Sequence, residues 1–350
     1  MRYADHSIAW LISNLRTNDF AELFNTELAS TRMRAGVCIS GCQKEGFTVL
    51  PPNFRDPSHN PDVVFMAKFV PDSNTGQYLD DSGVRRELWL RKIDSLASKN
   101  KKLILDYTDN HFTKAGIVGD FYREIKDFVS GLILPSQKMK ANIINDWDKF
   151  TAIIPEPVEV DFIEPERAKP DFREMTALWF GHVSNLTYLL DYMANQMHVA
   201  PPKHLIILTN NMPKEAVREG AKRAPKNMKV TLAPWSQDNM RRAAKVSHYC
   251  IIPSSKNDSR KNGVSPGRLL TSFALGLPVI AEGLDSYLPF SKFFAIVGTE
   301  SAELLAKNPA TYHEKIREAQ ELVRENYTVD AIEKEWVRVV KSFFNKEIEM

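Results

Sequence analysis

The chain has 350 residues, of which 43% are hydrophobic and 26% charged, and 46 lysines and arginines nearly balance 44 aspartates and glutamates. These values are typical of a globular protein with room for two domains, and the formal net charge of +2 gives no reason to expect a nucleic-acid partner. No apolar run approaches the ~18 residues that a membrane-spanning helix needs. The run beginning at Ile8 has no signal-peptide cleavage site after it, so it is interpreted as a first strand.

The first half of the chain alternates short apolar runs with longer amphipathic segments, the pattern of parallel α/β units. The predicted strands are Ile8–Ile12, Val37–Ile39, Val63–Phe65, Leu103–Leu105, Gly131–Leu134 and Ala152–Ile154. The predicted helices are Thr31–Arg34, Val84–Ser98, Gly119–Phe128 and Gln137–Asn145. The helix at 84–98 is basic enough to lean on an anionic membrane surface as a peripheral contact. Packing on the sheet through Trp89, Ile93 and Leu96 is the favoured interpretation.

A charged stretch with four prolines, Pro155–Asp171, is predicted to be an extended, exposed linker. The α/β pattern then starts again. The predicted strands of the second half are Thr176–Phe180, His204–Leu208, Val230–Leu232, Tyr249–Ile252, Val279–Ala281 and Phe294–Val297. The predicted helices are one that ends near Gln196, then Lys214–Arg223, Ser236–Lys245, Ser265–Leu275, Pro309–Glu325 and the amphipathic Asp330–Phe344.

These elements predict an α/β protein with two doubly wound, parallel-sheet (Rossmann-like) domains facing across a cleft. The expected N-terminal domain spans 1–158, the linker 159–172 and the C-terminal domain 173–326, with a final helix in 327–350. Ligands of open parallel sheets bind beyond the carboxyl ends of the strands, so the cleft is the expected site.

The most informative stretch covers residues 261–281. Ser265 is a good helix N-cap and Pro266 suits the first helical position, so a helix is predicted to begin here. Gly276 can end that helix in the left-handed conformation. A short buried strand, Pro278–Ala281, is expected to follow.

The start of this helix is predicted to bind an anion. Gly267 and Arg268 lie in its first turn, and Lys256, Arg260 and Lys261 precede it. Backbone N–H groups and the helix dipole favour negative charge at a helix N-terminus, and the cations reinforce them. A solvated basic loop is the alternative interpretation.

This order of parts resembles the donor-binding helix of GT-B nucleotide-sugar glycosyltransferases, particularly those of glycosyltransferase family 4. Further segments are similar to motifs of that family: Ser30–Arg34, Leu105–Asn110, Leu134–Ser136 followed by Ile153–Val158, Leu178–Gly181 and Ala233–Trp235. The resemblance implies a GT-B architecture whose last helix crosses back to the N-terminal domain. It also implies transfer of a sugar from a nucleotide-activated donor to a carbohydrate or lipid-linked glycan, with Trp235 near the nucleotide base.

One departure concerns the carboxylates of the family. Retaining members commonly carry a glutamate inside the donor helix, at the position that Thr271 occupies here, and another in the preceding loop, where this chain offers only Asp258. The choice between a retaining and an inverting mechanism therefore stays open. A catalytically silent sugar- or nucleotide-binding protein of the same fold is the main alternative, and a nucleotide-sugar epimerase is another.

Sugar transfer needs groups that stabilise the departing diphosphate. Arg268 and Lys261 are the chief candidates, and Gly181 would let the backbone approach the phosphates. The full predicted donor-binding set is Gly181, His182, Trp235, Lys256, Lys261, Ser265, Gly267 and Arg268.

On the acceptor side, Asp106 and Asp109 follow a predicted strand and are the candidates for a general base, unless they only cap a turn. Arg32 and Arg34 are candidates for contact with the donor or an anionic acceptor, or are simply solvated. His111 beside the second aspartate is more typical of a solvated turn residue. The chain has no dinucleotide-binding or P-loop motif and no convincing metal-ligand spacing, so neither a cofactor nor an essential metal is expected. Three cysteines, a sparse and odd set, favour a reducing compartment such as the cytoplasm.

Overall fold

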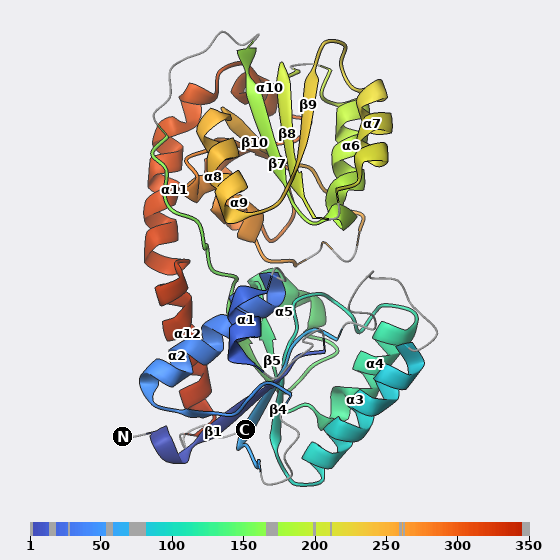
Figure 1. The fold of residues 1–350 in the computed structure, drawn as a ribbon, viewed down its shortest axis with the longest axis vertical. Coiled ribbons are helices and arrows are strands. Elements are labelled where there is room, and N and C mark those ends of the chain that lie inside the picture. Colours follow the sequence, from blue (N-terminus) through green and yellow to red (C-terminus); the bar gives the residue numbers. More distant parts are fainter. Residues whose placement is uncertain are drawn as a thin grey trace. The chain divides into compact units, whose positions relative to one another are not determined.

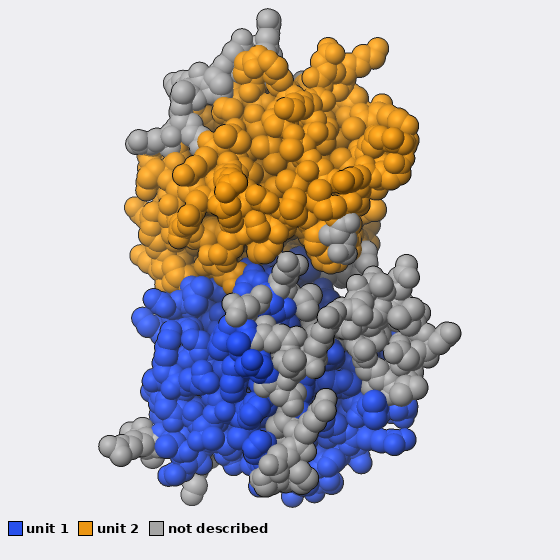
Figure 2. Space-filling view, in the orientation of Figure 1, with its two compact units in different colours: residues 1–157, 263–265, 329–350 blue, residues 158–262, 266–328 orange. Residues whose placement is uncertain are grey.

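The computed structural model describes residues 3–13, 19–26, 29–53, 59–69, 82–165, 174–198, 201–210, 212–258, 261 and 263–344. The chain divides into two compact units (Figure 2). Unit 1 comprises Met1–Pro157, Gly263–Ser265 and Val329–Met350, and unit 2 comprises Val158–Asn262 and Pro266–Thr328. Part of the predicted linker, 166–172, lies outside the described residues, as does Arg260.

Unit 1 is built on a six-stranded parallel sheet in the order β2-β1-β3-β4-β5-β6 (Figure 1). Its strands are β1 Ser7–Leu11, β2 Thr48–Val49, β3 Val63–Met66, β4 Lys102–Asp106, β5 Gly131–Leu134 and β6 Phe150–Ile153. Its helices are α1 Phe20–Asn25, a π-helical turn Thr31–Gly36, α2 Val37–Glu45, α3 Ser82–Ala97, α4 Ile117–Ile125, α5 Gln137–Ile143 and α12 Val329–Ser342.

Helices cover both faces of this sheet. Side chains of α3, α4 and α5 pack on one face, where Ile93 and Leu96 of α3 are buried as their spacing predicts. On the other face α2 packs beside α12, and the fully buried Trp336 of α12 contacts Trp10 at a ring-centroid distance of 5.6 Å. Burial of each such large apolar side chain contributes roughly 1.5–3 kcal/mol, so the last helix is an integral layer of unit 1.

Unit 2 has a second six-stranded parallel sheet, in the order β12-β11-β10-β7-β8-β9. Its strands are β7 Thr176–Phe180, β8 His204–Thr209, β9 Lys229–Pro234, β10 Tyr249–Ile252, β11 Val279–Ala281 and β12 Phe294–Ile296. Its helices are α6 Leu186–Asn195, α7 Lys214–Arg223, α8 Gln237–Val246, α9 Gly267–Ala274, α10 Glu300–Lys307 and α11 His313–Asn326. Counted along the chain, this is the strand order of a dinucleotide-binding Rossmann sheet, 3-2-1-4-5-6.

Side chains of α6, α7 and α10 cover one face of the second sheet, with Trp179 of β7 at the centre of the core. Helices α8, α9 and α11 lie on the other side (Figure 1). The buried amide of Gln320 in α11 donates to the carbonyls of Phe273 (2.9 Å) and Ala274 (3.1 Å), which end α9, and to that of Ile163 (2.8 Å). The Gln320 side chain therefore links α11 to the end of α9 and to the segment around Ile163.

The prediction of two doubly wound parallel sheets is confirmed, and β5, β7, β10 and β11 have the predicted bounds or differ from them by one residue at most. Three details are wrong. Val37–Ile39 begins α2 and is not a strand, because its apolar side chains pack in the core beside α12. The described part of the linker is not exposed throughout, since Val158 and Pro165 are buried. Ser265 does not cap α9, whose N-cap is Pro266.

Candidate functional site

The carboxyl edge of the second sheet contains a topological switch point between the neighbouring strands β7 and β10. From β7 the chain proceeds to β8 on one side, and from β10 it proceeds to β11 on the other. Connections after these two strands leave in opposite directions, which opens a crevice where open parallel sheets bind their ligands. Gly181 directly follows β7, and the loop after β10 leads into α9.

Arg268 lies at this switch point. Its Nη1 atom is 3.4 Å from the position that a Cβ would occupy on Gly181, and the Trp179 ring is 3.3 Å from the same position. The side chain is half-buried, and Nη1 is buried without a hydrogen-bond partner in the described part of the chain. A buried donor without a partner costs about 1–3 kcal/mol of stability, and more when it is charged. This guanidinium is therefore well suited to donate hydrogen bonds to a bound anion. The structure thus brings together two of the predicted donor-site residues.

Ser254 is a donor-site candidate that the sequence did not reveal. It lies two residues after β10, and its Oγ atom is also buried without a hydrogen-bond partner among the residues described. A serine in a loop carries no recognisable pattern of its own. Only the strand order, which puts the end of β10 beside the end of β7, gives it significance.

The loop after β10 is anchored to the start of α6. Lys261 donates from Nζ to Oδ1 of Asn185 (2.5 Å) and lies 5.6 Å from the centre of the Tyr188 ring. Asp258 accepts a hydrogen bond from the Tyr188 hydroxyl. Lys261 and Asp258 therefore already have protein partners, and their direct effect is to fix this loop.

The remaining predicted donor residues are spread over several strand ends. His182 is exposed and accepts from the N–H of Ser184 (3.2 Å), so it caps a short 3₁₀ turn. Trp235 is half-buried at the end of β9, two strands from the switch point. Lys256 is exposed. Its Nζ atom lies 3.1 Å from the position that a Cβ would occupy on Gly283, which is two residues after the end of β11.

Ser265 and Gly267 are separated by the division into units. Gly267 is the first residue of α9 in unit 2. Ser265 belongs to unit 1, where its hydroxyl is hydrogen-bonded to Glu156.

At the carboxyl edge of the first sheet, Arg34 and Asp106 form a buried ion pair. The Arg34 side chain is 0% exposed and that of Asp106 2%. The guanidinium donates from Nε (3.0 Å) and Nη2 (2.5 Å) to Oδ1 of Asp106, and from Nη1 to the carbonyl of Ile154. It also lies 5.2 Å from the centre of the Trp336 ring. A paired charge of this kind is costly to separate, so these two side chains stabilise the fold of unit 1.

Arg32 is also engaged within unit 1. It is half-buried and donates from Nη1 to the carbonyl of Thr26 (2.6 Å). Both predicted arginines that follow the first strand therefore donate hydrogen bonds to backbone carbonyls of unit 1.

Asp109 is the more accessible of the two predicted carboxylates, with a side chain 25% exposed. Lys68, which follows β3, forms an ion pair with its Oδ2 atom, and Nε2 of His111 is 3.9 Å away. Lys68 was not predicted from the sequence, because it precedes Asp109 by 41 positions and only strand pairing places it there.

His111 is not a solvated turn residue. It is 4% exposed and stacks on Tyr122 with the ring centres 4.6 Å apart. Both ring nitrogens lack hydrogen-bond partners in the part of the chain that the structure describes. Burial lowers the pKa of His111 to about 3, although Asp109 attracts the proton, so the ring is neutral at physiological pH.

Glu156 is a third carboxyl group at this edge. It follows β6 by three residues, is half-buried, and is hydrogen-bonded to the Ser265 hydroxyl. Burial raises the pKa of Glu156, and Arg34 and Ser265 partly oppose that shift. The sequence offered only a glutamate between two prolines, a pattern without functional meaning by itself.

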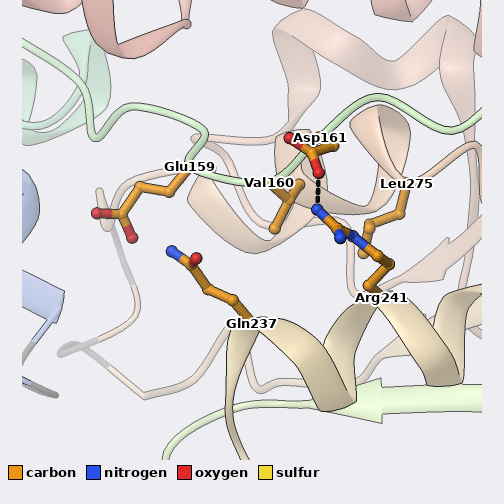
Figure 3. A pocket seen from close by; sticks show the side chains of 6 residues that line it. All are labelled: Glu159, Val160, Asp161, Gln237, Arg241 and Leu275. Carbon is orange, nitrogen blue, oxygen red and sulfur yellow. Dashed lines mark hydrogen bonds and ion pairs between the residues drawn. The ribbon is translucent and has the colours of Figure 1, made fainter.

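A small cavity of about 50 Å³ lies elsewhere in unit 2 (Figure 3). Its lining residues are Glu159, Val160, Asp161, Gln237, Arg241 and Leu275. Arg241 of α8 and Asp161 form an ion pair across it. None of the predicted donor or catalytic residues lines this cavity.

The described residues contain no group of three or more histidine, cysteine, aspartate or glutamate side chains arranged to hold a metal ion. Among the helices of the described segments, none is long and apolar enough to cross a membrane.

No family model matches the sequence, and no curated protein matches it either. Solved structures do match the fold. A glycosyltransferase from Rickettsia africae ESF-5 has a TM-score of 0.59 at 13% identity, and the match covers 98% of this chain and 99% of that one. An alpha-glucosyltransferase in complex with UDP-glucose and DNA containing an abasic site has a TM-score of 0.59 at 10% identity, with 95% and 98% covered.

TarM matches with a TM-score of 0.55 at 14% identity over 81% of this chain. The chain spans only about half of TarM, 55% of its length. The first two of these structures are glycosyltransferases, and the fold that this chain shares with the matched structures is the GT-B fold.

Proposed function

We propose that this protein is a glycosyltransferase that moves a sugar from a nucleotide-activated donor to a carbohydrate or lipid-linked glycan. The observation that carries the proposal is the guanidinium of Arg268, half-buried beside Gly181 at the switch point of the second sheet, with one nitrogen unpartnered among the described residues. This is where open α/β sheets bind phosphorylated ligands.

The donor diphosphate would occupy the crevice at the ends of β7 and β10. Negative charge develops on the departing diphosphate, and a fixed guanidinium stabilises that charge without reorganisation. The first-turn amides of α9 add the positive end of the helix dipole. Ser254 supplies a hydroxyl at the same strand end.

On the acceptor side, we propose Asp109 as the general base. Arg34 holds Asp106 in a buried pair, whereas Asp109 keeps a quarter of its side chain in solvent. Lys68 and the neutral His111 surround Asp109 and would fix its orientation.

A nucleotide-sugar-binding protein without transfer activity is the second candidate. Two observations favour it: Thr271 stands where retaining relatives carry a glutamate, and Asp106 is sequestered by Arg34. Both candidates require donor binding, and only the first requires turnover.

Calorimetric titration with UDP and GDP tests donor binding, and hydrolysis or transfer of the matching nucleotide sugars tests turnover. Arg268→Ala is expected to weaken binding of the nucleoside diphosphate by about 1.5–3 kcal/mol, the value of a charge-assisted hydrogen bond. Arg218→Ala is the matched control, because Arg218 is exposed on α7 and paired with Glu215. Unchanged binding by the folded Arg268→Ala variant would refute the assignment of the site.

The three cysteines, Cys38, Cys42 and Cys250, are free and buried. This supports the cytoplasm as the place where the protein acts, because free thiols persist in a reducing compartment.

A further inference from the structure

The turn that carries Asp109 is tied to one buried hydroxyl group. Tyr107 directly follows β4 and is 0% exposed. Its Oη atom accepts the N–H groups of His111 (2.6 Å) and Phe112 (2.8 Å). The same hydroxyl donates to Oδ1 of Asn110 (3.0 Å). These three hydrogen bonds close the turn around Asp109 and fix its backbone.

The segment that carries Lys68 is tied to a second buried hydroxyl group. Tyr122 of α4 is 1% exposed, and its Oη atom accepts the N–H of Phe69 (2.9 Å), the residue after Lys68. The Tyr122 ring also stacks on His111, with the ring centres 4.6 Å apart. Lys68 and His111 are the two side chains that lie beside Asp109. Tyr122 therefore contacts both of the segments that supply them.

The two tyrosines contact each other and remain protonated. Their rings meet edge to face, with the centres 5.7 Å apart. Burial raises the pKa of Tyr107 and of Tyr122. Each hydroxyl oxygen is thus a neutral acceptor for backbone N–H groups, and the Tyr107 hydroxyl keeps the proton that it donates to Asn110. A buried N–H group without an acceptor is costly, so these hydroxyl groups constrain the backbone around them.

A general base works only when it is held in the correct geometry, and a displacement of about 1 Å can cost about 100-fold in rate. We propose that the hydroxyl groups of Tyr107 and Tyr122 position Asp109 for proton abstraction. Tyr107 holds the turn that carries Asp109, and Tyr122 holds the segment whose Lys68 pairs with it. This inference rests on the proposed function, in which Asp109 is the base.

The experiment uses Tyr107→Phe and Tyr122→Phe, each of which removes one hydroxyl group and keeps the packed ring. Turnover is measured with a panel of UDP-, GDP-, ADP-, dTDP- and CMP-linked sugars, and the Kd of the matching nucleotide by calorimetry. Each variant is expected to lower kcat about 10-fold or more, because the base is misplaced. The Kd of the nucleotide should be unchanged. The two substitutions test the inference independently, and melting curves show that each variant is folded.

Asp62→Ala is the matched control. Asp62 precedes β3 and accepts the N–H of Ser7 (2.8 Å), the first residue of β1, so the bond lies at the amino edge of the same parallel sheet. Its loss also leaves a backbone N–H without its side-chain acceptor, far along the strands from Asp109. This variant should keep both the wild-type kcat and the wild-type Kd.

A double-mutant cycle with Lys68→Met separates positioning from a general structural role. If Tyr122 acts through Lys68, adding Tyr122→Phe to Lys68→Met should lower kcat by less than about twofold further, since coupled residues are not additive. Losses that multiply would mean that Tyr122 does not act through Lys68 and would overturn that part of the inference.

Asp109→Asn, measured in the same assay, distinguishes failure of this inference from failure of the proposed function. Normal kcat in both phenylalanine variants, together with a loss in Asp109→Asn, would overturn this inference alone. An equal loss in Asp62→Ala, or weaker nucleotide binding by the phenylalanine variants, would also overturn it. A wild-type chain that turns over none of the nucleotide sugars, or normal turnover by Asp109→Asn, would overturn the proposed function or its base, and this inference with it.

Discussion

At the scale of single residues, the two predicted carboxylates at the end of β4 have different roles. Asp106 points its carboxylate at Arg34 in a buried pair, and Asp109 three residues later keeps contact with solvent. The sequence presents both as acids after a strand. Only the ion pair, whose members are 72 positions apart, shows which one is committed to the fold.

The first prediction concerns the proposed base. Asp109→Asn is expected to lower kcat by about 10²–10⁴, the contribution of a general base, and to leave the Kd of the donor nucleotide unchanged. Asp120→Asn is the control, because Asp120 on α4 is exposed and paired with Arg123. Steady-state kinetics and calorimetry on the same samples measure both quantities. Normal turnover by Asp109→Asn would move the base elsewhere.

The second prediction is a loss of stability in acid caused by His111. Its pKa is about 3 in the folded protein and about 6.5 in an unfolded chain. Between these values the unfolded state binds a proton that the folded state does not, so the free energy of unfolding falls as pH falls. The slope from this residue approaches about 1.4 kcal/mol per pH unit.

Denaturant unfolding of the wild type and His111→Phe between pH 6.5 and pH 4 measures this effect. The variant keeps an aromatic ring against Tyr122 and is expected to show a shallower dependence on pH. His198→Gln is the control, because His198 is exposed and lies three residues after the end of α6. Identical slopes for His111→Phe and the wild type would show that His111 is not kept neutral by burial.

The residues proposed for the donor site differ from those around Asp109 in how far a local sequence pattern reveals them. Gly181 and Arg268 belong to strand–turn and loop–helix patterns that are local in sequence. Ser254, Lys68 and Glu156 gain their significance only from strand order and packing, so no local pattern reveals them.

At the scale of elements, buried strands were predictable where a short apolar run has turn residues on both sides, as at β7 and β10. A strand was wrongly predicted at Val37–Ile39 because this run is too short to distinguish a strand from a helix. A run of three apolar residues fits a buried strand or one face of a helix equally well. Packing against α12, which follows some 290 positions later, decides for the helix.

The third prediction tests the turn that ends α9. Gly276 has φ +68°, and a Cβ there would lie 2.2 Å from the carbonyl oxygen of Ile163. Gly46, which ends α2 with φ +91°, has no atom within 4 Å of such a Cβ. Gly276→Ala is therefore expected to lower the free energy of unfolding by at least about 1–3 kcal/mol more than Gly46→Ala, since overpacking adds to the shared backbone strain.

Thermal or denaturant unfolding of the two variants measures this difference. Because both substitutions place alanine in the left-handed region, the control isolates the contact with Ile163. Equal destabilisation would mean that the segment around Ile163 does not pack tightly against the end of α9 in solution.

At the scale of the whole molecule, the chain enters and leaves unit 2 at neighbouring positions. The N–H of Val158 donates to the carbonyl of Tyr327 (2.7 Å), and Val158 pairs with Thr328. After Thr328 the chain returns to unit 1, where α12 completes the layer beside α2. The amphipathic pattern of the last helix was evident from the sequence, but its partner was not, because α2 was interpreted as a strand.

The fourth prediction is that deletion after Thr328 destabilises the protein as a whole and lowers its Tm. The deletion removes Trp336 and uncovers Trp10 and Phe65, which contact it. Loss of one buried tryptophan alone costs about 3–5 kcal/mol. Calorimetric melting and size-exclusion chromatography check the result. A truncated protein with an unchanged Tm and a different oligomeric state would identify α12 as a dimerisation helix instead.

The central claim, that unit 2 holds the donor of a sugar transfer, is tested most directly by a thermal-shift screen of the full chain against nucleoside diphosphates and nucleotide sugars. A ligand present at 100 times its Kd stabilises the folded state by about 2.7 kcal/mol. We expect one nucleotide family to raise Tm in the wild type and not in Arg268→Ala. If no nucleotide changes Tm, or if the Arg268→Ala variant responds as the wild type does, the account of the donor site is wrong.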